Sequence, residues 1–292
     1  MRIIVLLIFL SLLFVRGHAE TRFVNTSGGT FFDVKDLSKE LLDFDVIFFG
    51  EMHTIEPVHR AQAELSHALA DVDPALMFSF EMWERDTQDL MDKFLAGELE
   101  EDRFVEESRA WGNYDSYRPM LMLAQERNLK VIAANIPRDY ATRVSREGWD
   151  FVWSLPDLER RWIAQKLTAP EDEYKKEFFG IMTDMGDHEM KPEDLENYYR
   201  AQCIKDDTMA ESIALYLKEH PGHRLMHFNG DFHSRAWRGT VSRLQELMPG
   251  LRIAVISPEI VDDLHKPVLP DDMAALASHL LILEPPIEEG ER

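Results

Sequence analysis

Acidic, amide and imidazole side chains recur just after apolar segments of this sequence. Glu51 and His53 follow the run FDVIFFG, and Glu81 ends the run ALMFSFE. The run KVIAANI contains Asn135 near its end, and the run RLMHFN leads directly into Asn229-Gly230-Asp231-Phe232-His233. One polar residue after an apolar run is expected wherever a strand ends. Recurrence after four runs indicates a functional site.

Two kinds of chemistry suit these residues. Imidazole nitrogens and carboxylate oxygens bind divalent metals, and the set predicted to do so is Glu51, His53, Glu81, Asp231 and His233. The same groups could act as general acid and base without a metal. For a hydrolase, the predicted catalytic residues are Glu51, His53, Glu81 and His233. In the simpler alternative the histidines only hydrogen-bond neighbouring loops, and Glu51 caps the next helix.

Several enzyme classes lack support in this sequence. It contains no HExxH zinc helix, no GxSxG turn, no P-loop and no GxGxxG after a strand. Its single cysteine, Cys203, lies in a helical pattern and is expected to be buried rather than reactive. Nucleophilic serine or cysteine catalysis is therefore not indicated, and an intramolecular disulfide is impossible.

The elements that must position these residues alternate between strands and helices. Short apolar runs ended by turn residues predict strands at 44–50, 75–81, 130–136, 224–229, 252–257 and 279–283. Apolar residues at helical spacing predict helices at 56–72, 118–128 and 206–220. This alternation is typical of a mainly parallel sheet flanked by helices, a three-layer α/β fold. Ligands of such sheets bind at the carboxyl ends of the strands, where the acids and histidines follow.

Residues 149–199 interrupt this alternation. They contain no convincing strand, and the stretch EDEYKKEFFGIMTDMGDHEM is rich in charge, aromatic residues and methionine. We interpret residues of about 149–200 as a helical insertion subdomain, which Pro156, Pro170 and Pro192 divide into helices. Such a subdomain could shield the edge of the sheet or form a lid or wall for a ligand.

The N-terminal residues predict export. Arg2 precedes the apolar stretch Ile3–Val15, which is short for a membrane span but suits the core of a signal peptide. Gly17-His18-Ala19 supplies small residues at the cleavage positions. We expect residues 1–19 to be removed after Ala19, leaving residues 20–292 as one periplasmic domain. The alternative is an uncleaved membrane anchor.

The charge balance limits the partners of the chain. It carries 54 acidic against 32 basic residues, a formal net charge of −22. Nucleic-acid binding needs a basic surface, so nucleic acid is not expected as a partner. Hydrophobic residues make up 45% of the sequence, enough for a sizeable core.

Several stretches together resemble a known family. VIFFGEMHTIEPVHRAQAEL, FSFEMWERDTQ, AANIPRDYA, YYRAQCIKDDTMAESI and HFNGDFH are similar to the ChaN-like haem-binding uptake family. That family lies in a larger Tiki group with erythromycin-esterase-like and TraB-like proteins. The resemblance covers about 44–257, in the family's order. It implies a three-layer α/β fold with a helical subdomain and a role outside the cytoplasm in haem or iron acquisition.

The resemblance also implies how haem would be held. Haem-binding members look like homodimers that hold haem between subunits, with a tyrosine as iron ligand and a histidine assisting at the propionates. The matching positions here are Tyr174 and His188, with Tyr199 as the next candidate tyrosine. Phenolate oxygen is a known haem-iron ligand. A group of four residues could cover the porphyrin or simply form the subdomain core: Phe178, Phe179, Met182 and Met185.

Two functions therefore compete. The first is an exported haem-binding protein that passes haem to membrane transport components. The second is a metal-dependent hydrolase, esterase- or peptidase-like, that uses the residues at the strand ends. A periplasmic interaction protein without chemistry is the third possibility. Family members are often lipoproteins, but no cysteine lies near the predicted cleavage site, so a lipid anchor is not indicated.

Overall fold

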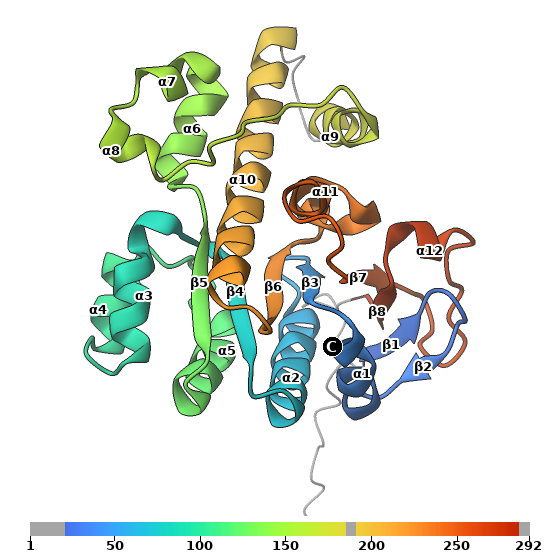
Figure 1. Ribbon diagram of the computed structural model, residues 1–292. Helices are drawn as coiled ribbons and strands as arrows, with labels where there is room; N and C mark the ends of the chain where they lie inside the picture. Colours follow the sequence, from blue (N-terminus) through green and yellow to red (C-terminus); the bar gives the residue numbers. More distant parts are fainter. Residues whose placement is uncertain (1–20, 185–190, 286–292) are drawn as a thin grey trace, which may run out of the picture.

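An eight-stranded sheet forms the centre of the computed structural model, which describes residues 21–184 and 191–285. The strand order is β2-β1-β8-β7-β3-β6-β4-β5 (Figure 1). The strands are β1 (Thr21–Asn25), β2 (Phe31–Phe32), β3 (Val46–Glu51), β4 (Leu76–Glu84), β5 (Lys130–Asn135), β6 (Arg224–Gly230), β7 (Ile253–Ile260) and β8 (His279–Leu283). All pairings from β8 to β5 are parallel, and only β1 and β2 are antiparallel. The predicted α/β class is confirmed.

Each predicted strand is present, and the differences lie at the ends. The second predicted strand continues to Glu84, and the fifth continues through Pro258 to Ile260. The N-terminal hairpin of β1 and β2 was not predicted, because β2 has only two residues and β1 carries polar residues at both ends. This hairpin pairs with β8 and extends the parallel sheet at that side.

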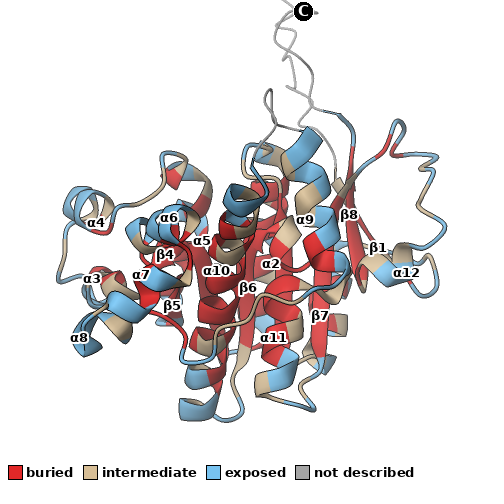
Figure 2. Cartoon of the chain, turned by 90° about the horizontal axis from the view of Figure 1, so that it is seen from above, coloured by how far each residue is buried: buried red, intermediate tan, exposed pale blue. Residues whose placement is uncertain are grey.

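Helices cover both faces of the sheet, as the three-layer prediction requires (Figure 1, Figure 2). They are α1 (Val34–Glu40), α2 (Glu56–Val72), α3 (Gln88–Leu95), α4 (Glu101–Glu107), α5 (Tyr114–Arg127), α6 (Arg138–Glu147), α7 (Trp149–Ser154), α8 (Asp157–Arg160), α9 (Glu173–Asp184), α10 (Pro192–Glu219), α11 (Gly239–Leu247) and α12 (Met273–Leu276). Successive strand residues point to opposite faces. Phe49 therefore joins the core under α1, α2 and α5, while Phe48 joins the core under α10 and α11.

Residues 149–200, predicted as a helical insertion subdomain, form helices and no strand where the structure describes them. These helices are α7, α8, α9 and the first turns of α10. The 28-residue helix α10 then continues into the layer that covers the sheet. At 1.5 Å per residue this helix is about 42 Å long. Within the described residues, no helix is long and apolar enough to cross a membrane.

A side chain pairs with the free edge of β5. The Gln88 amide nitrogen donates to the Val131 carbonyl at 2.8 Å, and the Ala133 N–H donates to the Gln88 amide oxygen at 2.8 Å. The amide of Gln88 thus takes the place of a peptide group from a further strand. Unpaired edge strands recruit other chains, so Gln88 protects this edge.

Candidate functional site

Two glutamates and two histidines meet at the carboxyl ends of β3, β4 and β6. These strands are neighbours in the order β3-β6-β4. Glu51 is the last residue of β3, Glu81 lies near the end of β4, and His233 lies in the 3₁₀ turn that follows β6. The fold therefore brings together the four residues predicted as the catalytic set, including His53 in the loop after β3.

Glu51 is the centre of the first group of contacts. Its buried carboxylate accepts hydrogen bonds from the Tyr117 hydroxyl at 2.7 Å, His53 Nδ1 at 2.8 Å and Gln62 Nε2 at 2.9 Å. A carboxylate only accepts when ionised, so His53 donates from Nδ1. His59 Nε2 lies 3.0 Å from the His53 carbonyl and supports the loop. Glu51 thus fixes the orientation of the His53 ring.

His53 is the accessible member of the site. Its side chain is 41% exposed, and its ring meets the Trp111 ring edge-on at 5.1 Å. Burial lowers the pKa of His53, but the hydrogen bond to Glu51 and the charge of Glu81 outweigh burial and raise it. The site therefore offers one imidazole to solvent, oriented by a buried carboxylate.

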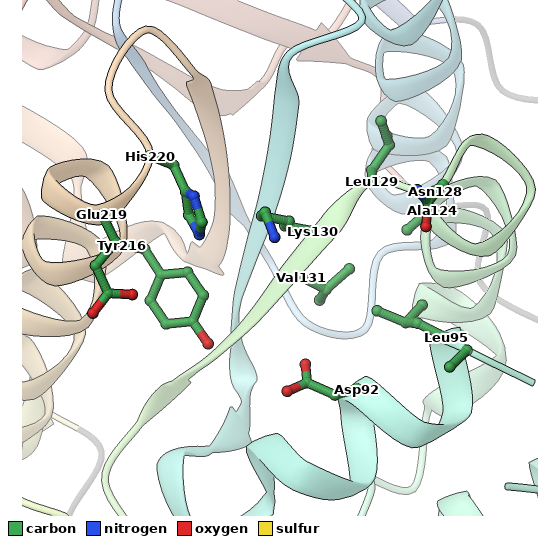
Figure 3. A pocket seen from close by; sticks show the side chains of 11 residues that line it. Asp92, Leu95, Ala124, Asn128, Leu129, Lys130, Val131, Tyr216, Glu219 and His220 are labelled. Atoms are coloured by element: carbon green, nitrogen blue, oxygen red, sulfur yellow. The ribbon is translucent and has the colours of Figure 1, made fainter. Parts of the chain in front are cut away.

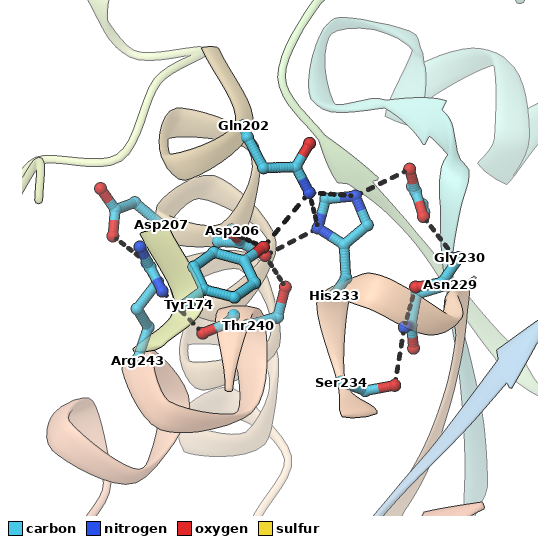
Figure 4. A network of polar contacts seen from close by, with 12 residues as sticks. Tyr174, Gln202, Asp206, Asp207, Asn229, Gly230, His233, Ser234, Thr240 and Arg243 are labelled. Carbon is cyan, nitrogen blue, oxygen red and sulfur yellow. Dashed lines mark hydrogen bonds and ion pairs between the residues drawn. The ribbon is translucent and has the colours of Figure 1, made fainter. Parts of the chain in front are cut away.

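A second group of contacts surrounds His233, which lies between the buried carboxylates of Glu81 and Asp206 (Figure 4). Its Nδ1 is 2.7 Å from Asp206 Oδ1 and its Nε2 is 3.3 Å from Glu81 Oε1. Burial alone would lower the pKa of His233, but Glu81 and Asp206 raise it to about 9. Burial would likewise raise the pKa of Glu81, but the His233 charge lowers it. We therefore assign a buried imidazolium between two carboxylates.

Gly230 connects the two groups. Its N–H donates to Glu81 Oε2 at 2.7 Å. A Cβ atom at position 230 would lie 2.8 Å from His53 Nε2, closer than real contacts allow. The second nitrogen of His53 therefore lies directly over the β6 backbone. Only glycine leaves room for this approach.

Asp231 and Asn135 have structural roles. Asp231 accepts from the Ser257 hydroxyl at 2.7 and 2.8 Å and pairs with Arg235. Burial raises the pKa of Asp231 to about 6. Asn135 donates to the Glu81 carbonyl at 2.9 Å and so fixes the neighbouring strand end.

The predicted divalent-metal set is not supported. Among the residues that the structure describes, no three His, Cys, Asp or Glu side chains are grouped to hold a metal ion. The physical reason is the pairing described above. His233 has both nitrogens directed at carboxylates, and Asp231 turns toward β7.

Tyr174, predicted as an iron ligand, is buried beside Asp206 and Gln202. It lies on α9, and its hydroxyl donates to Asp206 Oδ2 at 2.7 Å (Figure 4). The Gln202 amide nitrogen is 3.2 Å from the same hydroxyl. Burial, and then the Asp206 charge, raise the pKa of Tyr174 well above its usual value. In this conformation the phenol is protonated and turned away from solvent.

The other residues predicted to contact haem are buried, partly buried or outside the described residues. Tyr199 is buried, and its hydroxyl donates to the Pro170 carbonyl at 2.9 Å. Phe178 and Phe179 are partly buried and pack beside Tyr199. Met182 is partly buried as well. His188 and Met185 lie outside the described residues.

Sequence reasoning did not assign roles to Tyr117, Gln62, Gln202 or Asp206. The helix predicted from residue 118 begins at Tyr114, so Tyr117 was left outside it. Asp206 had a recognisable signal. It stands on the stripe of α10 that carries Cys203, Met209 and Ala210, and an acid on an apolar stripe indicates a buried partner.

The fold of the chain is that of a ChaN-type α/β protein. A solved structure described as cofacial haem binding to ChaN of Campylobacter jejuni superposes with a TM-score of 0.69 at 18% identity, covering 91% of this chain and 97% of that chain. An erythromycin esterase, EreC, in its open conformation reaches a TM-score of 0.47 at 11% identity, covering 92% of this chain and 85% of that chain.

The sequence match gives the family. A family model described as haem-binding uptake, Tiki superfamily, ChaN matches residues 37–244, well over half of the chain. The chain therefore belongs to the ChaN haem-binding uptake family, and the predicted resemblance is confirmed. No curated protein sequence matches the chain.

Proposed function

We propose that this protein binds haem outside the cytoplasm as part of haem uptake. The observation that carries the proposal is the family match across residues 37–244. The Campylobacter jejuni protein of the same fold is described as binding haem cofacially. Export by the N-terminal segment, delivery to membrane transport components and a homodimer that encloses haem are parts of this proposal.

The proposed haem surface is formed by α9 and the first half of α10. Ile181 on α9 is 41% exposed and Tyr198 on α10 is 42% exposed. Phe178 and Phe179 on α9 are partly buried and pack beside Tyr199 of α10. A porphyrin is a flat apolar ring that binds best to apolar and aromatic side chains. These residues fit such a ligand, and a second copy of the chain would cover its other face.

The proposed iron ligand is a tyrosine of this surface. Tyr174 is the residue that the family pattern indicates. Ligation by Tyr174 requires its hydrogen bond to Asp206 to break, α9 to shift, and the phenol to lose its proton. Ligation by Tyr198 would need neither a broken hydrogen bond to Asp206 nor a shift of α9, because its ring is already exposed. Tyr199 would have to release the Pro170 carbonyl.

Hemin titration of the purified chain without residues 1–19 tests the proposal. We expect a new Soret band with saturable binding, and a charge-transfer band typical of a phenolate ligand. Tyr174→Phe, Tyr198→Phe and Tyr199→Phe identify the ligand by the loss of that band. Tyr140→Phe is the matched control, since α6 lies on the other side of α10 from α9 (Figure 1). An unchanged Soret region on titration of the unaltered chain refutes haem binding.

Oligomeric state and location complete the test. Analytical ultracentrifugation should show a dimer that forms or tightens with hemin. Fractionation of cells that express the full-length chain should place the shorter, processed form in the periplasm. A chain that stays monomeric with bound hemin contradicts the dimer, and an unprocessed chain in the membrane fraction supports the uncleaved anchor.

One observation supports a second candidate function, hydrolysis. His53 is 41% exposed, is held at Nδ1 by Glu51, and has Nε2 over the Gly230 backbone. An oriented imidazole of this kind suits a general base. A panel of ester and peptide substrates, with and without divalent metals, tests this function. Activity that is unchanged in Glu51→Gln and His53→Gln would exclude it.

A further inference from the structure

A cavity of about 500 Å³ lies at the opposite end of the sheet from Glu51, Glu81 and His233. It opens where β5 begins and α10 ends, between α3 and α5 (Figure 3). Small-molecule sites typically have volumes of about 300–1,000 Å³. The cavity is therefore large enough for a ligand of the size of an amino acid.

The walls of this cavity carry charges of both signs. In Figure 3 the Asp92 carboxylate and the Tyr216 hydroxyl point toward the same space, while Lys130 and His220 lie across it. Among the described residues, the side chain of Lys130 makes no hydrogen bond or ion pair, and the Asp92 carboxylate accepts from the neutral amide of Gln88 at 2.8 Å. Opposite charges that face one cavity without neutralising each other suit a ligand with both charges.

The neutral groups of the wall favour the same ligand. Burial, and then Asp92, raise the pKa of Tyr216 to about 12, so the phenol is a hydrogen-bond donor at neutral pH. Burial, and then Lys130, lower the pKa of His220, which favours a neutral ring. The floor is apolar and is formed by Leu95, Ala96, Ala124, Leu129 and Val131.

We propose that this cavity binds a small zwitterion, an α-amino acid with an apolar side chain. Lys130 holds the carboxylate, with His220 beside it. Asp92 holds the ammonium group, and the Tyr216 hydroxyl donates to the carboxylate. The ligand's side chain packs on the floor around Val131. This site is separate from the proposed haem surface, because it lies at the other end of α10.

Isothermal titration calorimetry with three related ligands tests this proposal. L-leucine has both charges, L-leucinamide lacks the carboxylate, and 4-methylpentanoic acid lacks the amine. We expect saturable binding of leucine and at least about tenfold weaker binding of the other two, because each of them lacks one of the two charged groups that the walls would hold. Absence of saturable heat with leucine at millimolar concentration overturns the proposal, as does equal binding of leucinamide.

Variants place the binding in this cavity. Lys130→Gln and Asp92→Asn should each weaken leucine binding by about tenfold or more. Lys218→Gln is the matched control, since Lys218 is exposed on α10 and does not line the cavity. Leucine binding that is unaffected by both cavity variants refutes the assignment.

Discussion

The proton on His233 should make folding stability depend on pH in the alkaline range. The imidazolium lies between Glu81 and Asp206 in the folded chain, where its pKa is about 9, whereas an unfolded histidine has a pKa near 6.5. The folded state therefore holds one more proton than the unfolded state between these two values. Stability from this group is fully present below pH 6.5 and is lost as the pH rises through 9.

The magnitude follows from the two pKa values. The folded and unfolded pKa values differ by about 2.5, and at about 1.4 kcal/mol for each pKa unit this amounts to about 3–4 kcal/mol in the free energy of unfolding. The side chain is 6% exposed, so solvent screening does not reduce this figure greatly. We expect the free energy of unfolding to fall by about 3–4 kcal/mol between pH 6 and pH 10 through this group alone.

Urea unfolding at a series of pH values measures this effect. Because His233→Gln alone would leave Glu81 charged and uncompensated, the test variant is His233→Gln with Glu81→Gln, whose stability should decline less steeply. The control replaces the exposed residues Glu64 and His67 of α2 with glutamine. Equal slopes in the test variant and the unaltered chain, or an NMR titration of His233 with a pKa below 7, refute the assigned charge state.

Three further results are expected. Tyr117→Phe removes a hydroxyl that donates to Glu51 at 2.7 Å, and urea unfolding should show a loss of about 1–3 kcal/mol because the buried carboxylate loses a donor; an unchanged midpoint contradicts this. Cys203 is buried and burial raises the pKa of its thiol to about 12, so Ellman's reagent should react with it only in denaturant, and rapid reaction of the folded chain would show that α9 opens readily. Gln88→Ala exposes the edge of β5 and should increase self-association in light scattering, whereas Gln88→Glu, which keeps the acceptor, should do so less.

The strands and several helices were predictable because their signals are local. The helix predicted at 56–72 matches α2, since Pro57 marks its first turn and Asp73-Pro74 follows its end. The helix predicted to end at Asn128 does so, with that residue in the left-handed conformation at φ 53°. Parallel strands buried on both faces appear as continuous apolar runs, and six of them were visible in the sequence.

The contacts within the site were not predictable in the same way. Strand ends indicated that Glu51, Glu81 and His233 share one edge of the sheet. The pairing of Tyr174 with Asp206 joins α9 to α10, 32 residues later, and no local pattern encodes that distance. The sequence therefore suggested an accessible tyrosine at position 174, whereas in the fold this tyrosine is buried and hydrogen-bonded to Asp206.

The two edge strands of the sheet, β2 and β5, limit how copies of this chain can assemble. At one edge β2 offers only two residues for pairing, and at the other edge Gln88 already occupies the Val131 carbonyl and the Ala133 N–H of β5. A dimer that continues the sheet from one subunit into the next would have to displace Gln88 or rely on a strand of two residues. Two subunits are therefore expected to meet through helices, with the strands of each sheet remaining separate.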